Sequence, residues 1–134
     1  MRFLLIAVYC IIPFLLLGCG SSDVASVVGT VEVNGQPLAN GTISFGPAEG
    51  DGDAASATIT NGAYEVRIAP GPKVIQITGP RVTGQRKAYE GPGAPMIDII
   101  EESIPEQYNV RTTLKMDVQP GKNTKTWTLQ TNKK

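Results

Sequence analysis

The sequence predicts an all-β protein, and three observations support this prediction. Apolar residues recur at every second position in seven segments after residue 26, which is the periodicity of half-buried strands. Glycine- or proline-containing turn sequences separate most of these segments. No segment of useful length has helical periodicity. We therefore expect a seven-stranded antiparallel β-sandwich, in which two stacked sheets bury their apolar faces.

The expected strands are defined by their inward-facing residues. In chain order these are Val27, Val31 and Val33; Ile43 and Phe45; Ala57 and Ile59; Tyr64, Val66 and Ile68; Ile75 and Ile77; Leu114, Met116 and Val118; and Trp127 and Leu129. Asn61-Gly62 predicts a two-residue hairpin between the third and fourth strands. Gly29 stands in the apolar register of the first strand, where a missing side chain permits a neighbouring backbone to approach closely. The three aromatic residues in apolar register are expected in the core rather than on a sugar-stacking surface.

The first nineteen residues predict a secreted, lipid-anchored protein. Met1-Arg2 is a short positive region, and residues 3–17 form an uncharged apolar run. Such a run suits a signal peptide and is shorter than the ~20 residues of a spanning helix. The run ends in Leu16-Leu17-Gly18-Cys19, which resembles the lipobox of bacterial lipoproteins. The resemblance implies cleavage before Cys19 and lipid attachment to its sulfur; the alternative is an ordinary signal peptide with an accidental cysteine.

This interpretation divides the chain into a signal peptide (1–18), a lipidated tether (19–26) and a β-sandwich domain (27–131). Loss of the signal peptide also removes Cys10, so no internal disulfide can form. The mature chain then has eleven basic and twelve acidic residues, which gives no electrostatic reason to expect nucleic acid. We expect attachment to a membrane facing the periplasm or the exterior. Gly20 follows the cysteine in place of an aspartate that favours inner-membrane retention, which favours the outer membrane.

The strand and turn residues resemble the carboxypeptidase regulatory-like domains, which are transthyretin-like (prealbumin-like) β-sandwiches. The first matching segment is Gly29–Phe45, with its glycine-led strand, turn and Pro-Leu pair. The second combines Thr58, Asn61-Gly62, Tyr64 and Pro70-Gly71, and the region 104–123 is similar to the ending of small envelope lipoproteins. The resemblance implies an accessory or structural module. A purine-pathway hydrolase with this fold uses histidines and a carboxy-terminal Tyr-Arg-Gly-Ser, and this chain has neither.

Residues 79–112 are expected to form a long loop, because they show no clear periodicity. The first part is basic and the second part is acidic, with isoleucines among the acids. One interpretation packs the isoleucines and Tyr108 across the sandwich while the charges stay in water. The other makes this loop a partner surface, and its candidate interaction residues are Arg81, Arg86, Lys87, Tyr89 and Tyr108.

No catalytic, cofactor-binding or metal-binding set is expected. Histidine is absent, and no nucleophile has a base at a recognisable spacing. Glu49, Asp51 and Asp53 alternate with glycines in the predicted loop 46–54, which permits a weak calcium site. The loop lacks the ligand spacing of a dedicated calcium loop, so a solvated acidic loop is the preferred interpretation.

Three functions are therefore considered for the mature protein. The first is a non-enzymatic, lipid-anchored envelope module that acts as a structural element or through contacts with unidentified envelope proteins. The second is a glycan or small-ligand binding module that uses the sandwich loops, for which Tyr89 and Tyr108 are the available aromatics. The third, a hydrolase, would need a site built without histidine. The oligomeric state does not follow from the sequence.

Overall fold

The computed structural model describes residues 23–132, and nearly all of its regular structure is β. The strands are β1 (Ala25–Val33), β2 (Gln36–Pro37), β3 (Asn40–Pro47), β4 (Ala55–Thr60), β5 (Ala63–Ile68), β6 (Gly71–Thr78), β7 (Pro80–Lys87), β8 (Met96–Glu102), β9 (Lys115–Val118) and β10 (Lys122–Leu129). A 3₁₀ turn, η1, covers Glu106–Tyr108. Among the described residues, no helix is long and apolar enough to cross a membrane.

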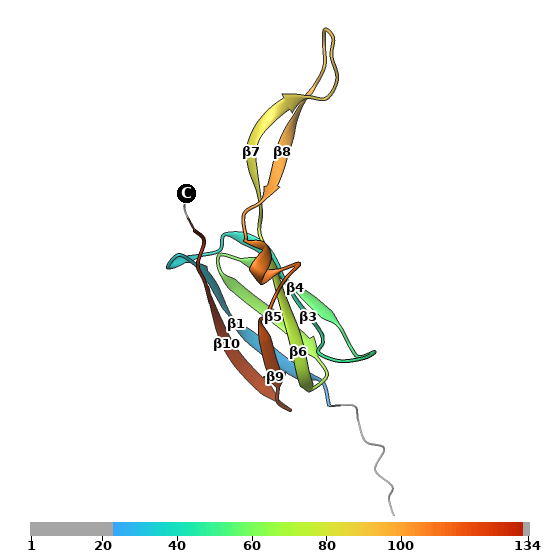
Figure 1. Cartoon of the computed structure of the whole chain (residues 1–134), viewed down its shortest axis with the longest axis vertical. Coiled ribbons are helices and arrows are strands. Elements are labelled where there is room, and N and C mark those ends of the chain that lie inside the picture. The colour runs from blue at the N-terminus through green and yellow to red at the C-terminus, as the bar shows by residue number, and fades with distance from the viewer. Residues whose placement is uncertain (1–22, 133–134) are drawn as a thin grey trace, which may run out of the picture.

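The main sheet folds over on itself to form the predicted all-β sandwich (Figure 1). Its strand order is β10-β1-β5-β4-β3-β6-β9, with β2 added beside β1. The sheet bends between β5 and β4, where a single residue pair, Thr60 with Ala63, joins the two strands. One layer therefore contains β10, β1 and β5, and the other contains β4, β3, β6 and β9.

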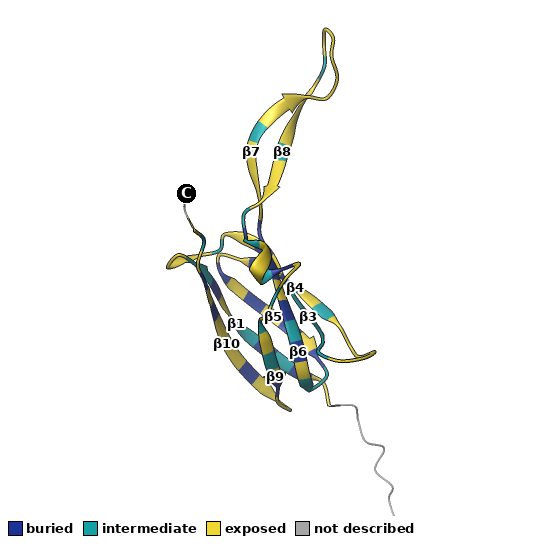
Figure 2. Ribbon diagram, viewed as in Figure 1, coloured by how far each residue is buried: buried dark blue, intermediate teal, exposed yellow. Residues whose placement is uncertain are grey.

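All seven predicted strands are present, as β1, β3, β4, β5, β6, β9 and β10. Their alternation buries one side of each layer, and Figure 2 shows the resulting dark bands along the sandwich. The core is Ala25, Val27, Val31, Ile43, Phe45, Ile59, Tyr64, Val66, Ile68, Ile75, Ile77, Ile104, Val118, Trp127 and Leu129. The rings of Phe45 and Tyr64 lie 6.3 Å apart between their centroids, so the two layers touch through their aromatics.

The turns follow their sequence signals. Asn34 and Asn61 have φ of 51° and 49°, and the glycines that follow them have φ of 80° and 81°. Two successive positive φ angles suit the tight hairpin turns that match the twist of the flanking strands. The predicted Asn61-Gly62 hairpin is therefore confirmed as a turn, but its strands separate into different layers.

Strand β1 lies in the middle of its layer and pairs with both of its neighbours. It runs antiparallel to β5 and parallel to β10, with eight residue pairs from Ser26 with Lys122 to Val33 with Leu129. This parallel pair differs from the all-antiparallel expectation. Ala25 is buried and already belongs to β1, so the domain begins two residues before its predicted start at residue 27.

Gly29 allows β1, β5 and β10 to approach closely, as predicted. A Cβ atom built on Gly29 would lie 1.7 Å from the carbonyl oxygen of Lys125 and 2.9 Å from the Tyr64 hydroxyl oxygen. The Tyr64 hydroxyl donates to that same carbonyl at 2.8 Å and accepts from Trp127 Nε1 at 3.2 Å. Burial raises the pKa of Tyr64 above 10.0, and the hydrogen bond from Trp127 partly opposes this shift.

Residues 79–112 are more ordered than the predicted loop. They contain β7 and β8, which pair with each other and with no other described strand, followed by η1. Ile104 reaches the core, and Tyr108 packs against it. Ile97, Ile99 and Ile100 do not reach the core but lie on the β7–β8 hairpin. The prediction that all the isoleucines pack across the sandwich is therefore wrong for these three.

Candidate functional site

The most distinctive surface is a two-stranded hairpin that projects from one end of the sandwich (Figures 1 and 2). We call residues 80–102, which contain β7, β8 and their connection, the arm. It leaves the end of the sandwich opposite to the start of β1 (Figure 1). Strands of this length span roughly 25 Å at about 3.3 Å per residue. The arm therefore places its outer residues far from the N-terminal end of the domain.

The register of the arm assigns its side chains to two faces. Residue pairs run from Pro80 with Glu102 to Lys87 with Met96, and a bulge at Thr83 interrupts them. Side chains alternate between faces along a strand, and paired residues share a face. One face therefore contains Val82, Gln85, Lys87, Met96, Asp98 and Ile100, and the other contains Arg81, Gly84, Arg86, Ile97, Ile99 and Glu101.

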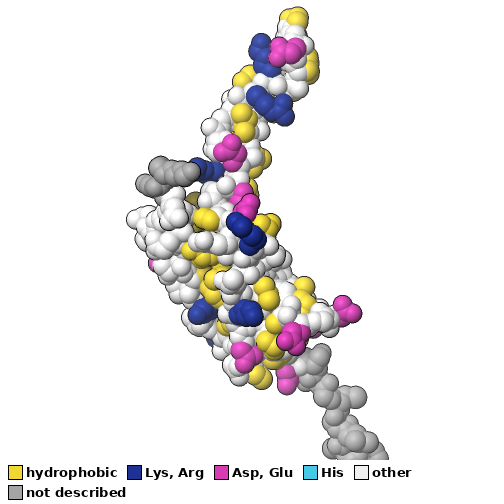
Figure 3. Space-filling view, in the orientation of Figure 1, with side chains coloured by type: hydrophobic (Ala, Val, Ile, Leu, Met, Phe, Trp, Pro, Cys, Tyr) yellow, Lys and Arg dark blue, Asp and Glu magenta, His cyan; other side chains and the backbone are white. Residues whose placement is uncertain are grey.

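Large apolar side chains are exposed along the arm. Val82, Met96 and Ile100 are more than half exposed, as is Tyr89 in the connection between the strands. Val82 and Ile100 form a cross-strand pair at 57% and 65% exposure, so neither is covered by the sandwich. Figure 3 shows apolar atoms scattered along the arm between charged groups. The cross-strand pair of Val82 and Ile100 is the exposed apolar contact that a partner could cover.

The charges on the arm are separated by strand. Arg81, Arg86 and Lys87 lie on β7, whereas Asp98, Glu101 and Glu102 lie on β8. The register places Arg81 opposite Glu101. Among the described residues, however, the ion pair within 4.0 Å is Arg111 with Glu106, outside the arm. The basic residues of β7 and the carboxylate of Glu101 are therefore available to external partners, whereas Asp98 accepts from Gln85 Nε2 at 2.8 Å.

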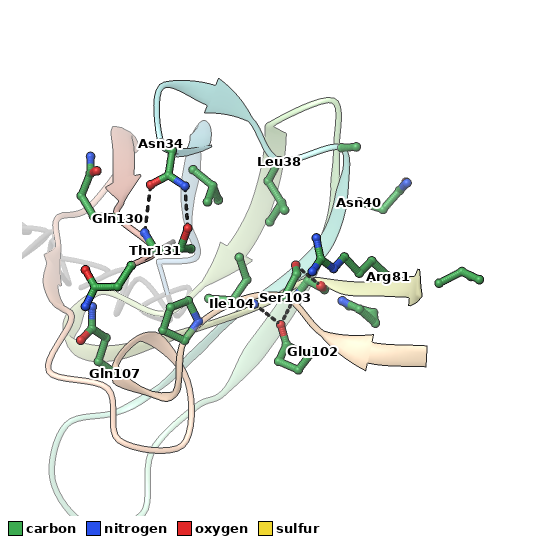
Figure 4. Close-up of a pocket in the computed structure, with 17 residues that line it drawn as sticks. Asn34, Leu38, Asn40, Arg81, Glu102, Ser103, Ile104, Gln107, Gln130 and Thr131 are labelled. Atoms are coloured by element: carbon green, nitrogen blue, oxygen red, sulfur yellow. Dashed lines mark hydrogen bonds between the residues drawn. The ribbon is translucent and has the colours of Figure 1, made fainter. Parts of the chain in front are cut away.

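Glu102 holds the base of the arm against the sandwich (Figure 4). Its Oε1 atom accepts from the backbone N–H of Gly79 at 2.7 Å and of Ile104 at 2.8 Å. The Ser103 hydroxyl also donates to the Gly79 carbonyl, and Ile104 inserts into the core. Both ends of the arm are thereby fixed to one rigid end of the sandwich.

A groove of about 1010 Å³ lies beside the base of the arm (Figure 4). Four separate segments line it, within the ranges 33–40, 79–82, 102–107 and 130–132. Its apolar lining includes Leu38 and Ile104, and amide side chains surround these residues. The side-chain amide of Asn34 is already hydrogen-bonded to Thr131. Its nitrogen donates to the Thr131 hydroxyl, and its oxygen accepts from the Thr131 backbone N–H. No aromatic residue lines the groove.

The predicted interaction residues fall in two places. Arg81, Arg86 and Lys87 lie on β7, and Tyr89 follows in the connection of the arm. Tyr108 lies in η1 and packs against the core, where its hydroxyl accepts from the Gln130 N–H at 3.1 Å. The structure therefore brings four of the five together on the arm and separates Tyr108 from them.

The sequence prediction missed the contribution of β8. Ile97, Ile99 and Ile100 are β-branched residues, which favour a strand, although acidic residues lie among them. The alternation typical of a half-buried strand is missing, because both faces of β8 carry apolar residues and both faces are exposed to solvent. Trp127, Tyr64 and Phe45 are buried, as predicted, so the described exposed surface has no aromatic cluster.

Two predicted sites remain, the lipidation site and the acidic loop 46–54. Cys19 lies outside the described residues. Glu49, Asp51 and Asp53 are all exposed in the connection between β3 and β4. Among residues 23–132, no group of three potential metal-ligating side chains is close enough to hold an ion.

Comparison with known proteins gives few similarities. No protein-family model matches the chain, and no curated protein matches it. Among solved structures, a DUF3823 family protein from Parabacteroides merdae superimposes with a TM-score of 0.39 and 12% sequence identity. The similar region covers 81% of this chain and 46% of that protein, so the chain spans less than half of its length.

Proposed function

We propose that the protein is a non-enzymatic, lipid-anchored module of the bacterial envelope that acts through protein contacts made by the arm. The observation that carries this proposal is the projecting hairpin, whose exposed apolar side chains are not covered by the sandwich and whose basic residues form no ion pair among the described residues. A two-stranded hairpin on its own is marginally stable in water. An additional partner would cover its apolar residues and its two unpaired edges.

The position of the arm supports anchoring at the other end of the domain. β1 begins at Ala25, so five residues separate it from Cys19. With Cys19 lipidated, the sandwich would stand close to the membrane and hold the arm outward. The resemblance to carboxypeptidase regulatory-like domains agrees with an accessory role of this kind.

Site-specific photocross-linking in intact cells tests the proposed contact surface. A photoreactive amino acid replaces Ile100 on the arm, and in a control it replaces Thr58, an exposed residue of β4 on the sandwich. We expect protein adducts from position 100, identified by mass spectrometry, and few from position 58. Equal or absent adducts from position 100 would contradict the role of the arm. Metabolic labelling with an alkyne fatty acid tests the anchor, with Cys19→Ala as the unlabelled control.

A second candidate function, binding of a glycan or another small polar ligand, is favoured by the groove beside the arm. Gln107, Gln130 and Asn132 supply amide groups at its rim, and Arg81 supplies a cation. Amide and charged groups of this kind hydrogen-bond hydroxyl-rich ligands. Titration calorimetry against envelope glycans, with Gln107→Ala as the comparison variant, tests this function. A heat signal lost in the variant would favour it over the protein-contact function.

A further inference from the structure

The two outer edges of the arm differ in their ability to pair with another strand. β7 begins with Pro80 and contains the bulge at Thr83, and both features disfavour the addition of a strand. β8 runs from Met96 to Glu102 without proline or bulge and contains three isoleucines. Its outer edge has no strand beside it among the described residues. β8 is therefore the open edge.

We propose that the open edge of β8 pairs antiparallel with β8 of a second copy of this chain, across a twofold axis at Ile99. This inference rests on the proposed function and names the partner of the arm. It would produce a four-stranded ribbon in the order β7-β8-β8-β7. Ile99 is the middle residue of the seven in β8, so a symmetric pair centred on it uses the whole strand.

The charge pattern of β8 favours this register. Centred on Ile99, the symmetric pairing places every acidic residue opposite an apolar residue of the second copy: Asp98 faces Ile100, Glu101 faces Ile97, and Glu102 faces Met96. In an antiparallel pair of identical strands, directly opposite residues share a face of the sheet. The twofold axis must therefore pass between two copies of the same residue. The neighbouring registers are centred on Asp98 or Ile100. The first sets Asp98 against Asp98, and the second sets Asp98 against Glu102. Like charges directly opposite each other destabilise a strand pair.

The same register gives the basic residues of β7 acidic neighbours. Arg86 pairs with Ile97 in its own arm, and Glu101 of the second copy would lie on the far side of Ile97. Two strand spacings of about 4.8 Å separate Arg86 from that glutamate by roughly 10 Å between Cα atoms, which long side chains can bridge. The four side chains of Ile97 and Ile99 would form a shared apolar cluster beside Gly84. Charge and apolar complementarity therefore agree on one register.

The dimer would have a defined shape. Because the two β8 strands run antiparallel, the sandwiches would lie at opposite ends of the ribbon. Their N-terminal ends would point away from each other, since each arm leaves the sandwich opposite to the start of β1 (Figure 1).

Sedimentation of the full chain in detergent tests the proposal. We expect a concentration-dependent monomer–dimer equilibrium whose dissociation constant rises at least tenfold in Ile99→Asp, because two carboxylates then face each other at the axis. The control is Thr58→Asp, the same new charge at an exposed residue of β4 on the sandwich, which should change the constant less than threefold. A chain that stays monomeric at all concentrations would overturn the proposal, as would equal effects of the two variants.

Disulfide trapping tests the register without depending on affinity. Ile99→Cys should form a covalent dimer under mild oxidation, whereas Val82→Cys should not. The two variants are otherwise identical, so any background from the native cysteines is shared. If Ile99→Cys gives no dimer while photocross-linking from position 100 captures a different protein, the self-pairing is refuted and the proposed function stands. If neither experiment yields an adduct, both are refuted.

Discussion

Replacing Gly29 with alanine should be among the most damaging single-methyl changes in the sandwich. The new Cβ would lie 1.7 Å from the Lys125 carbonyl oxygen, whereas non-bonded heavy atoms need roughly 3.5 Å. β1 and β10 would have to separate by nearly 2 Å at this point. Overpacking of this kind costs about 1–3 kcal/mol. Separation would also break the bond from the Tyr64 hydroxyl to that carbonyl, which adds about 1–3 kcal/mol for a buried group left without a partner.

The expected loss is thus about 2–6 kcal/mol of unfolding free energy, a large part of the ~5–15 kcal/mol typical of a small domain. Urea denaturation measures it through the fluorescence of Trp127, the single tryptophan, with circular dichroism as a second probe. Gly46→Ala is the matched control, because its Cβ would meet no atom closer than 4.0 Å. A Gly29→Ala loss below about 0.5 kcal/mol, the range of neutral surface changes, would refute this reasoning, as would an equal loss in the control.

Three further predictions concern single side chains. Burial raises the pKa of Tyr64 above 10.0, so the unfolded chain loses this proton first as the pH rises; stability should be unaffected by this group below pH 10 and fall above it. In Tyr64→Phe the urea midpoint should therefore fall less above pH 10 than in the wild type. An identical fall in both proteins would contradict this prediction. Asn109→Ala should lose about 1–3 kcal/mol in urea denaturation, because its buried amide nitrogen donates to the carbonyls of Ile77 and Ile104. Glu102→Ala should speed amide hydrogen exchange in the arm but not in β1, whereas Glu102→Gln retains an acceptor oxygen and should exchange like the wild type; no difference between the variants would show that Glu102 does not fix the arm.

The sandwich strands could be predicted because burial of one face imposes a period of two on the sequence. Tyr64, Val66 and Ile68 alternate with exposed residues in β5, and the structure buries all three. Gly29 was also predictable, since a glycine in an apolar register indicates close backbone approach. The pattern of a strand does not identify its neighbours, however. The parallel pairing of β1 with β10 therefore could not be predicted.

The arm was missed for a related physical reason. Sequence periodicity detects a strand through the difference in polarity between its two faces, and the two faces of the arm are similar in polarity. Ile99 and Ile100 point to opposite sides of β8, and neither side is covered by the sandwich. Apolar residues in such a segment were expected in the core, as happens for Ile104. The groove could not be predicted either, because its lining comes from four distant segments.

The central position of β1 between β5 and β10 has a mechanical consequence. A pull between the N-terminal end of β1 and the arm would act along the strands, because the two points lie at opposite ends of the sandwich (Figure 1). The hydrogen bonds on either side of β1 would then be loaded in shear at the same time, rather than broken one after another. A domain tethered at one end and gripped at the other would resist tension through this strand.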